Sequence, residues 1–213
     1  MQLDPWAKRL EVKARPERYR QIVTQLGPRY ARCTLDGYSI YDNAQRTVME
    51  QLRDIEANMP DRLCDGSGIV LYGKPGTGKD HLLVALMYTA IIRYGFTAKW
   101  EHGPSMMASI RDRMFRDNCP ESEIVGEFQS PQILVISDPI PPKGDASQHT
   151  ASVLQRIIDY RYRHLLSTWV SINVSSGAEA SKRLSSPTVD RLRHNSLALT
   201  CNWESYRARK GDK

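Results

Sequence analysis

The sequence lacks the residue patterns that build most metal sites, membrane anchors and secretion signals. Its cysteines form no C-x-x-C pair and its five histidines form no H-x₃-H pair, so a zinc site is not expected. No apolar run approaches the length of a membrane span, and the N-terminus does not resemble a signal peptide. These absences predict a cytoplasmic protein with reduced thiols that does not bind a membrane.

Acidic residues are scarce in one part of the chain. The 213 residues include 30 Lys and Arg against 24 Asp and Glu, which gives a net charge of +6. Most of this excess lies in residues 1–32, which contain eight basic and three acidic residues. Such a segment indicates an acidic partner such as nucleic acid, and a solvated basic helix face is the alternative.

Beyond this segment, short apolar runs alternate with helical patterns. This alternation predicts an α/β fold with a parallel sheet that is covered by helices on both faces. The expected strands are 69–72, 96–100, 133–138, 168–174 and 197–201. The expected helices are 41–59, 79–94, 103–116, 121–129, 149–166, 178–185 and 187–195.

The chain divides by composition into a basic N-terminal arm (1–40), an α/β domain (41–207) and a polar tail (208–213). One or two helices are expected in the arm, interrupted near Pro16 and ended at Gly27-Pro28. Because the arm has too little apolar surface for a core of its own, it is expected to dock on its own domain or on another protein. We favour the other protein.

A glycine-rich segment after the first expected strand has the pattern of a phosphate-binding loop, G-x-x-x-x-G-K, followed at once by an apolar helix. Gly76 and Gly78 let successive N–H groups point at one anion, and Lys79 brings a positive charge to the β and γ phosphates. The loop predicts nucleotide binding. The residues expected to bind the nucleotide are Gly73, Lys74, Pro75, Gly76, Thr77, Gly78, Lys79, Asp80 and His81.

Asp80 departs from this pattern, because the residue after the lysine is usually a Ser or Thr whose hydroxyl binds Mg²⁺. A carboxylate about 4 Å from a phosphate charge is repelled by roughly 4 kcal/mol at an effective dielectric near 20. Two interpretations stay open. Either Asp80 binds the metal directly, or it points away and favours the start of the helix.

Two further strand ends carry polar side chains. Ser137 and Asp138 follow the apolar run 133–136, and Asn173 lies near the end of the strand expected at 168–174. In open α/β sheets, ligands bind beyond the C-terminal ends of the strands. An acid at the first position is suited to Mg²⁺, and an amide at the second is suited to orienting water or contacting the γ-phosphate. A strand-end turn cap is the alternative for Asn173.

From about Tyr30 onward, the chain resembles the AAA+ ATPases of the DnaC/IstB type, which are helicase loaders and transposon ATP-binding proteins. The likeness is carried by Gly73–Lys79 with His81-Leu82, by Val189-Asp190-Arg191-Leu192-Arg193, and by Asn202-Trp203-Glu204-Ser205-Tyr206-Arg207. The resemblance implies a P-loop NTPase with an AAA+ ATPase domain at 41–207, and a chain too short for a C-terminal lid domain and its arginine.

Specific roles follow from the same resemblance. Lys79 falls at the Walker A lysine, Asn173 at sensor 1, and Arg191 at the arginine finger that acts on the nucleotide of a neighbouring subunit. Arg193 is a second choice for the finger. The arm corresponds by position to the family's helicase-docking region. The implied cofactors are ATP and Mg²⁺, and the implied assembly is a homo-oligomer with ATP between subunits.

The residues after the apolar run 133–136 depart from the family pattern, in which this strand ends in Asp-Glu. Here the two positions hold Ser137 and Asp138, followed by Pro139. In one register Ser137 replaces the metal acid and Asp138 is a shortened base. In the other, Asp138 holds the metal and the base is lost. The residues expected at the metal are therefore Asp80, Ser137 and Asp138, and the catalytic residues are Asp138, Asn173 and Arg191.

Together these residues favour a slow ATPase, aided by assembly or DNA, that loads a replicative helicase and holds single-stranded DNA. The alternatives are an IstB-like factor that assists a transposase, an ATP-gated adaptor with little or no hydrolysis, and a small P-loop kinase. A kinase mechanism would not require Asn173 or Arg191 at these positions. The basic residues considered for DNA are Lys99, Arg111, Arg113 and Arg116, each of which otherwise belongs to a solvated helix face.

Overall fold

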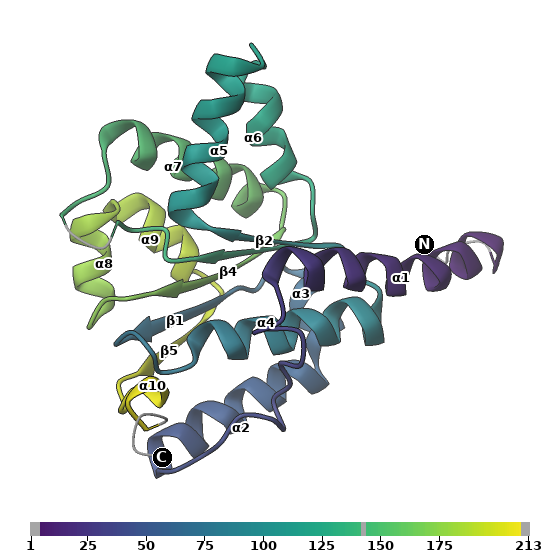
Figure 1. Cartoon of the computed structure of the whole chain (residues 1–213), viewed down its shortest axis with the longest axis vertical. Coiled ribbons are helices and arrows are strands. Elements are labelled where there is room, and N and C mark those ends of the chain that lie inside the picture. The colour runs from purple at the N-terminus through teal and green to yellow at the C-terminus, as the bar shows by residue number, and fades with distance from the viewer. Residues whose placement is uncertain (1–4, 142–143, 210–213) are drawn as a thin grey trace.

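The computed structural model describes residues 5–141 and 144–209, with side chains for 13–141 and 144–208. Its parallel strands form one sheet in the order β2-β3-β4-β1-β5 (Figure 1). The expected fold class is confirmed, and β4 separates the strand that enters the glycine-rich loop from the strand that ends in Ser137. The strands are β1 (Ile69–Gly73), β2 (Ala98–His102), β3 (Ile133–Ser137), β4 (Ser167–Ile172) and β5 (Leu197–Cys201).

Helices precede, separate and follow these strands. On the N-terminal side they are α1 (Pro5–Leu26), α2 (Asn43–Ala57) and α3 (Met59–Cys64). The helix after the glycine-rich loop is α4 (Lys79–Thr89), which continues into the π-helix η1 (Ala90–Tyr94). The others are α5 (Gly103–Arg116), α6 (Glu121–Gln129), α7 (Gln148–Arg163), α8 (Gly177–Arg183), α9 (Ser186–Arg193) and α10 (Tyr206–Arg209).

Successive residues of the central strands face opposite layers of the core. In β1, Ile69 and Leu71 pack with α1, α2 and α4, whereas Val70 and Tyr72 pack with α5 to α9. A strand covered on both faces has no polar side, which explains the uninterrupted apolar runs in the sequence. The arrangement brings the C-terminal ends of β1, β3 and β4 to one edge of the sheet.

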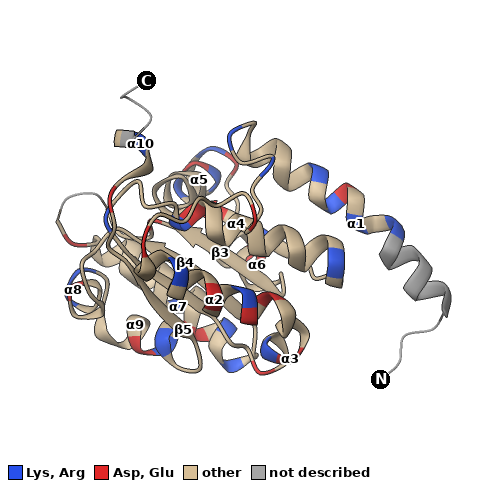
Figure 2. Ribbon diagram, turned by 90° about the horizontal axis from the view of Figure 1, so that it is seen from below, with Lys and Arg blue, Asp and Glu red and all other residues tan. Residues whose placement is uncertain are grey.

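The arm differs from its expected form, because α1 runs through Pro16 without interruption. A proline inside a helix costs roughly 3 kcal/mol, and contacts made by the following turns offset this cost. Arg18 donates to the Gly95 carbonyl at 3.1 Å, Tyr19 meets the ring of Tyr88 edge-on, and Ile22 is buried. The second half of α1 therefore docks on its own domain, while the helix extends outward toward the N-terminus (Figure 1), and its part from Lys13 onward carries basic residues (Figure 2).

Other element boundaries differ by a few residues. The helix expected at 41–59 ends at Ala57, and Pro60 lies in the first turn of α3, where its missing N–H costs nothing. The second strand begins at Ala98 rather than at 96. Asn173 lies just beyond β4. The last four residues of the expected tail and the first four of the arm lie outside the described residues.

Candidate active site

A cavity of about 860 Å³ lies at the C-terminal edge of the sheet, where ligands of α/β proteins bind. Its volume is suited to a nucleotide. The glycine-rich loop and the start of α4 form one side of it, and the ends of β3 and β4 form the floor with Asp138, Ser171 and Asn173. The sequence-predicted residues Gly76, Gly78, Lys79, Asp80 and His81 all line this cavity.

The two inner glycines of the loop are required by the backbone. Gly76 and Gly78 have φ values of 83° and 87°, which side chains of L-residues rarely adopt. A Cβ atom at Gly76 would lie 2.0 Å from the Ser205 hydroxyl, and one at Gly78 would lie 2.6 Å from the Tyr38 ring. The loop is therefore held against segments from both ends of the chain.

Hydrogen bonds fix the loop to these two segments. The Thr77 carbonyl accepts one bond from the Tyr38 hydroxyl at 2.7 Å and another from Trp203 Nε1 at 2.9 Å. The Tyr206 N–H donates to the Gly76 carbonyl at 3.0 Å. These bonds hold the loop in shape before any ligand arrives, which lowers the entropy cost of binding.

Lys79 is buried below the loop, with only 5% of its surface exposed. Its ammonium donates to the carbonyls of Gly73 and Lys74 at 2.9 and 2.8 Å and to Asn173 Oδ1 at 2.8 Å. These three bonds use all three of its donors. Burial lowers the pKa of Lys79, because a charge is costly in a low-dielectric surrounding.

The side chain of Asp80 points toward the ends of β3 and β4 rather than away from the cavity. Its Oδ1 accepts hydrogen bonds from the Ser137 hydroxyl at 2.9 Å and from the Ser171 hydroxyl at 2.5 Å. The carboxylate thus lies over the ends of β3 and β4 and lines the cavity.

Asp138 is joined to Lys79 through Asn173. The Asn173 amide donates to both carboxylate oxygens of Asp138 at 2.6 Å, while its own oxygen accepts from Lys79. Asp138 has a φ of 50°, just beyond the end of β3 at Ser137. Burial and then the neighbouring charge of Asp80 raise the pKa of Asp138.

The cavity is lined by two carboxylates, Asp80 and Asp138, which are oxygen ligands of the kind that magnesium binds together with phosphate oxygens and water. Within the described part of the chain, no group of three or more His, Cys, Asp or Glu side chains is arranged to hold a metal alone. The donor set therefore suits a cation that arrives with a phosphate ligand, and the cavity above Lys79 leaves room for one.

Arg191 does not enter this cavity. Its Nε lies 2.8 Å from an oxygen of Asp159, and a terminal nitrogen donates to the Pro187 carbonyl at 3.0 Å. It borders two other cavities, of about 370 and 990 Å³, and Arg193 lines the larger of them.

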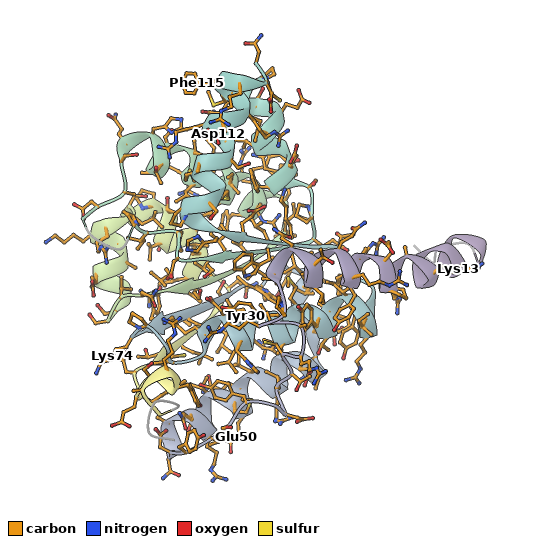
Figure 3. The ribbon with its side chains drawn as sticks, viewed as in Figure 1. Lys13, Tyr30, Glu50, Lys74, Asp112 and Phe115 are labelled. Atoms are coloured by element: carbon orange, nitrogen blue, oxygen red, sulfur yellow. The ribbon has the colours of Figure 1, made fainter. Side chains whose placement is uncertain are left out.

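The sequence did not identify several aromatic and basic residues of the cavity wall. Arg29 and Tyr30 come from the segment between α1 and α2 (Figure 3), and Tyr206 and Arg207 come from the segment after β5. Arg207 thus brings a guanidinium to the cavity from a chain segment that forms no lid. Tyr206 and Arg207 belong to the segment Asn202–Arg207 that carries the family resemblance, and the repeated Tyr and Arg residues at 29–41 were the signal for the other segment.

The basic residues considered for DNA fall into two groups. Lys99 and Arg113 both form ion pairs with Glu127, at 3.6 and 2.7 Å. Arg111 and Arg116 are exposed on α5, at whose end Phe115 keeps 83% of its surface exposed. Of the four, Lys99 and Arg113 are therefore engaged with an acid of the same chain. None of the helices described is long and apolar enough to cross a membrane.

Comparison with protein families matches residues 22–213 to the model described as IstB-like ATP binding protein. The expected resemblance is thereby confirmed. Among curated proteins, the replicative helicase loader DnaC of Escherichia coli K12 is 26% identical over 183 residues, covering 85% of this chain and 72% of that protein. The DnaC of Buchnera aphidicola from Acyrthosiphon pisum is 28% identical over 188 residues, covering 84% and 70%.

Solved structures share the fold. The crystal structure of a DnaC helicase loader superposes with a TM-score of 0.73 at 22% identity, covering 82% of this chain and 99% of that one. A replication initiator DnaA bound to AMPPCP and single-stranded DNA gives 0.66 at 18% identity, covering 84% and 51%. The fold is thus common to the three.

Proposed function

The chain belongs to the family of IstB-like ATP-binding proteins, and from this premise we propose that it is an AAA+ ATPase that loads a replicative helicase onto DNA. The proposal is carried by one observation, the hydrogen-bonded chain Lys79–Asn173–Asp138 on the floor of a nucleotide-sized cavity. The helicase is the partner because the curated relatives aligned over most of this chain are helicase loaders.

The loop N–H groups and Lys79 would bind the phosphates of ATP, and Asp80 would be available to the accompanying Mg²⁺. Bound Mg²⁺ would screen the phosphate charge, and ATP would supply the phosphoanhydride bond that water cleaves to give ADP and phosphate. Arg207 lines the same cavity and adds a second cation to the phosphate surroundings.

Asp138 accepts a proton from the attacking water, and Asn173 orients this water. In the present geometry Asn173 engages both oxygens of Asp138. Both donors of the Asn173 amide are directed at Asp138, so one of these bonds has to be released before Asn173 orients the water. This requirement, with an Asp in place of the longer Glu, predicts slow turnover by the isolated chain.

Arg191 acts on the nucleotide of a neighbouring copy, where a guanidinium stabilises charge on the transferred phosphoryl group. Its position outside the cavity of its own chain supports this role. To reach a neighbour, the side chain has to leave Asp159, and at 30% exposure this ion pair is weakened by solvent. ATP would then lie between subunits of a homo-oligomer.

Single-stranded DNA contacts the outer end of α5. Phe115 lies at this end, far from the sheet (Figure 3), and exposed Arg111 and Arg116 flank it. Aromatic stacking on a base contributes about 1–3 kcal/mol, and arginines add phosphate contacts. Phe115→Ala should weaken binding of a fluorescent oligothymidine by about tenfold or more, whereas Tyr162→Ala, an exposed aromatic on α7, should not.

The helicase binds the outer half of α1. The inner half is already held by the domain through Arg18 and through Gln25, which donates to the Trp100 carbonyl at 2.8 Å. Removal of residues 1–12 should therefore abolish pull-down of a replicative helicase and leave ATP binding intact. Capture of a transposase instead would favour the transposition factor, which the family description supports as the second candidate.

The deciding experiment measures ATP turnover with and without single-stranded DNA for the wild type, Lys79→Ala and Arg191→Ala. We expect DNA to raise turnover and both substitutions to abolish the increase, while a mixture of the two variants partly restores it, because some interfaces then pair an intact loop with an intact arginine. Asp159→Ala is the matched control, since it breaks the same ion pair and keeps Arg191.

Binding of ATP with no turnover under any condition would contradict the ATPase and favour an ATP-gated adaptor. Loss of turnover in Asp159→Ala to the same extent as in Arg191→Ala would contradict the role of the arginine in trans.

A further inference from the structure

Asp80 and Ser137 lie together at one side of the cavity, and their residue types are exchanged relative to the usual P-loop pattern. In most P-loop proteins a Ser or Thr hydroxyl follows the lysine, and an acid at the end of a nearby strand helps to hold the metal. Here Asp80 follows the lysine, and Ser137 ends β3. The two side chains still contact each other, since the Ser137 hydroxyl donates to Asp80 Oδ1 at 2.9 Å.

The hydroxyl of Ser171, on another strand, also donates a hydrogen bond to the Asp80 carboxylate. Ser171 on β4, the strand between β1 and β3, donates to Asp80 Oδ1 at 2.5 Å. Both hydroxyls thus bind one oxygen, and among the described residues Asp80 Oδ2 accepts no hydrogen bond. Asp80 therefore has one oxygen available to a cation.

Asp138 differs from Asp80 because, among the described residues, neither of its carboxylate oxygens is without a hydrogen bond. Both of its oxygens accept bonds from the Asn173 amide, and it lies one residue beyond β3 in a left-handed backbone conformation. Because Ser137 takes the last position of the strand, Asp138 occupies the position that follows the metal acid. The two carboxylates of the cavity thus have separate surroundings and separate roles.

Resting on the ATP site proposed above, we propose that Asp80 is the direct protein ligand of the divalent cation that accompanies the nucleotide. The metal-binding carboxylate has moved from the strand to the first turn of α4, and Ser137 and Ser171 are positioning residues that aim it. The two positions are interchangeable on this account, so an acid at 137 should replace the acid lost from 80.

The test measures Mn²⁺ by electron paramagnetic resonance in the presence of saturating ATP. Asp80→Thr should weaken Mn²⁺ affinity about 10- to 100-fold, and Asp80→Thr combined with Ser137→Asp should restore it to within about threefold of the wild type. Asp80→Asn keeps the shape and an acceptor for both hydroxyls, and it serves if the threonine variant does not fold. Asp138→Asn should lose turnover and keep Mn²⁺ affinity.

The role of Ser171 is tested by two substitutions. Ser171→Ala should weaken Mn²⁺ affinity about tenfold, and Ser171→Thr should recover it because the hydroxyl returns. A purely structural serine would change thermal stability without this pattern of loss and rescue, which would contradict its positioning role.

Failure of this inference is distinguishable from failure of the ATP site. If the wild type binds a fluorescent ATP analogue and Asp80→Asn leaves Mn²⁺ affinity unchanged, Asp80 is not the ligand and the ATP site stands. The same holds if the double variant fails to recover affinity. If the wild type binds no ATP analogue at all, the proposed function is wrong and this inference falls with it.

Discussion

Two buried cations lie at opposite edges of the sheet, and their surroundings differ in kind. Arg161, at the N-terminal edge, is fully buried and has no acidic partner among its bonds. Its guanidinium makes five hydrogen bonds, to Thr168 Oγ1 and to four backbone carbonyls around the starts of β3 and β4. The carbonyls belong to Phe128, Pro131, Gln132 and Ser167.

Lys79, at the C-terminal edge, is also buried, and burial lowers the pKa of both cations, that of Arg161 to about 9. One of the three acceptors of Lys79 is the movable amide of Asn173, and a cavity adjoins it. Arg161 bonds mainly to fixed backbone. Burial of a charge therefore does not by itself mark a binding site, whereas burial beside exchangeable partners and open space does.

The largest effect is expected at Arg161. Arg161→Met leaves several buried carbonyls without donors, each at a cost of about 1–3 kcal/mol, so the free energy of unfolding should fall by about 3 kcal/mol or more. Urea unfolding measures this change. Arg163→Met, two residues along α7 and exposed, should change it by less than about 0.5 kcal/mol. Equal losses of unfolding free energy in the two variants would show that the buried hydrogen bonds of Arg161 do not stabilise the fold.

Unlike Arg161→Met, Lys79→Met should weaken ligand binding strongly and change stability little. ATP affinity should fall about 100-fold, because the phosphates lose a buried positive charge. The free energy of unfolding should change by only about 1 kcal/mol, since water in the cavity can bond to the carbonyls that are freed. Titration of a fluorescent ATP analogue and urea unfolding measure the two quantities. Lys182→Met, an exposed lysine on α8, is the control for affinity.

Asn173→Ala tests whether the exchangeable partner matters. Loss of a hydrogen bond to a charged group costs about 1.5 kcal/mol, so turnover should fall about tenfold while ATP affinity changes less. Asn173→Gln keeps the amide at a shifted position and should recover little. Unchanged turnover in the alanine variant would mean that Asn173 only caps the end of β4.

The smallest expected effect is a pH dependence at Asp138, whose pKa is raised by burial and by Asp80. Between the ordinary pKa of an Asp and this raised pKa, the folded chain keeps a proton that the unfolded chain has lost. This contribution to stability is therefore present at low pH and is lost as pH rises through the raised pKa. Turnover should rise over the same range, because the base has to be ionised.

Urea unfolding and turnover, each measured from about pH 4 to about pH 7, check these opposite trends. Asp138→Asn should remove this contribution to the pH dependence of stability and abolish turnover. A pH profile of turnover that is flat across this range would exclude Asp138 as the base.

Most of the fold and part of the site could be predicted from the sequence. The loop at 73–79 and the strand ends at Ser137 and Asp138 were located correctly, because local pattern and strand order together determine where they lie. The interruption at Pro16 was predicted wrongly, because contacts of the following turns outweigh the local cost of the proline. Tyr206 and Arg207 were not predicted as cavity residues, because a chain segment after the last strand can pack in many places.

The sequence by itself determined the parallel sheet and the phosphate-binding loop, because both depend on periodicity and on spacing within short segments. Only the tertiary structure decided the orientation of Asp80, which depends on hydroxyls from Ser137 and Ser171. It also decided that Arg191 pairs with Asp159 outside the cavity. These contacts join residues far apart in the chain, and only the packing of strands and helices brings such residues together.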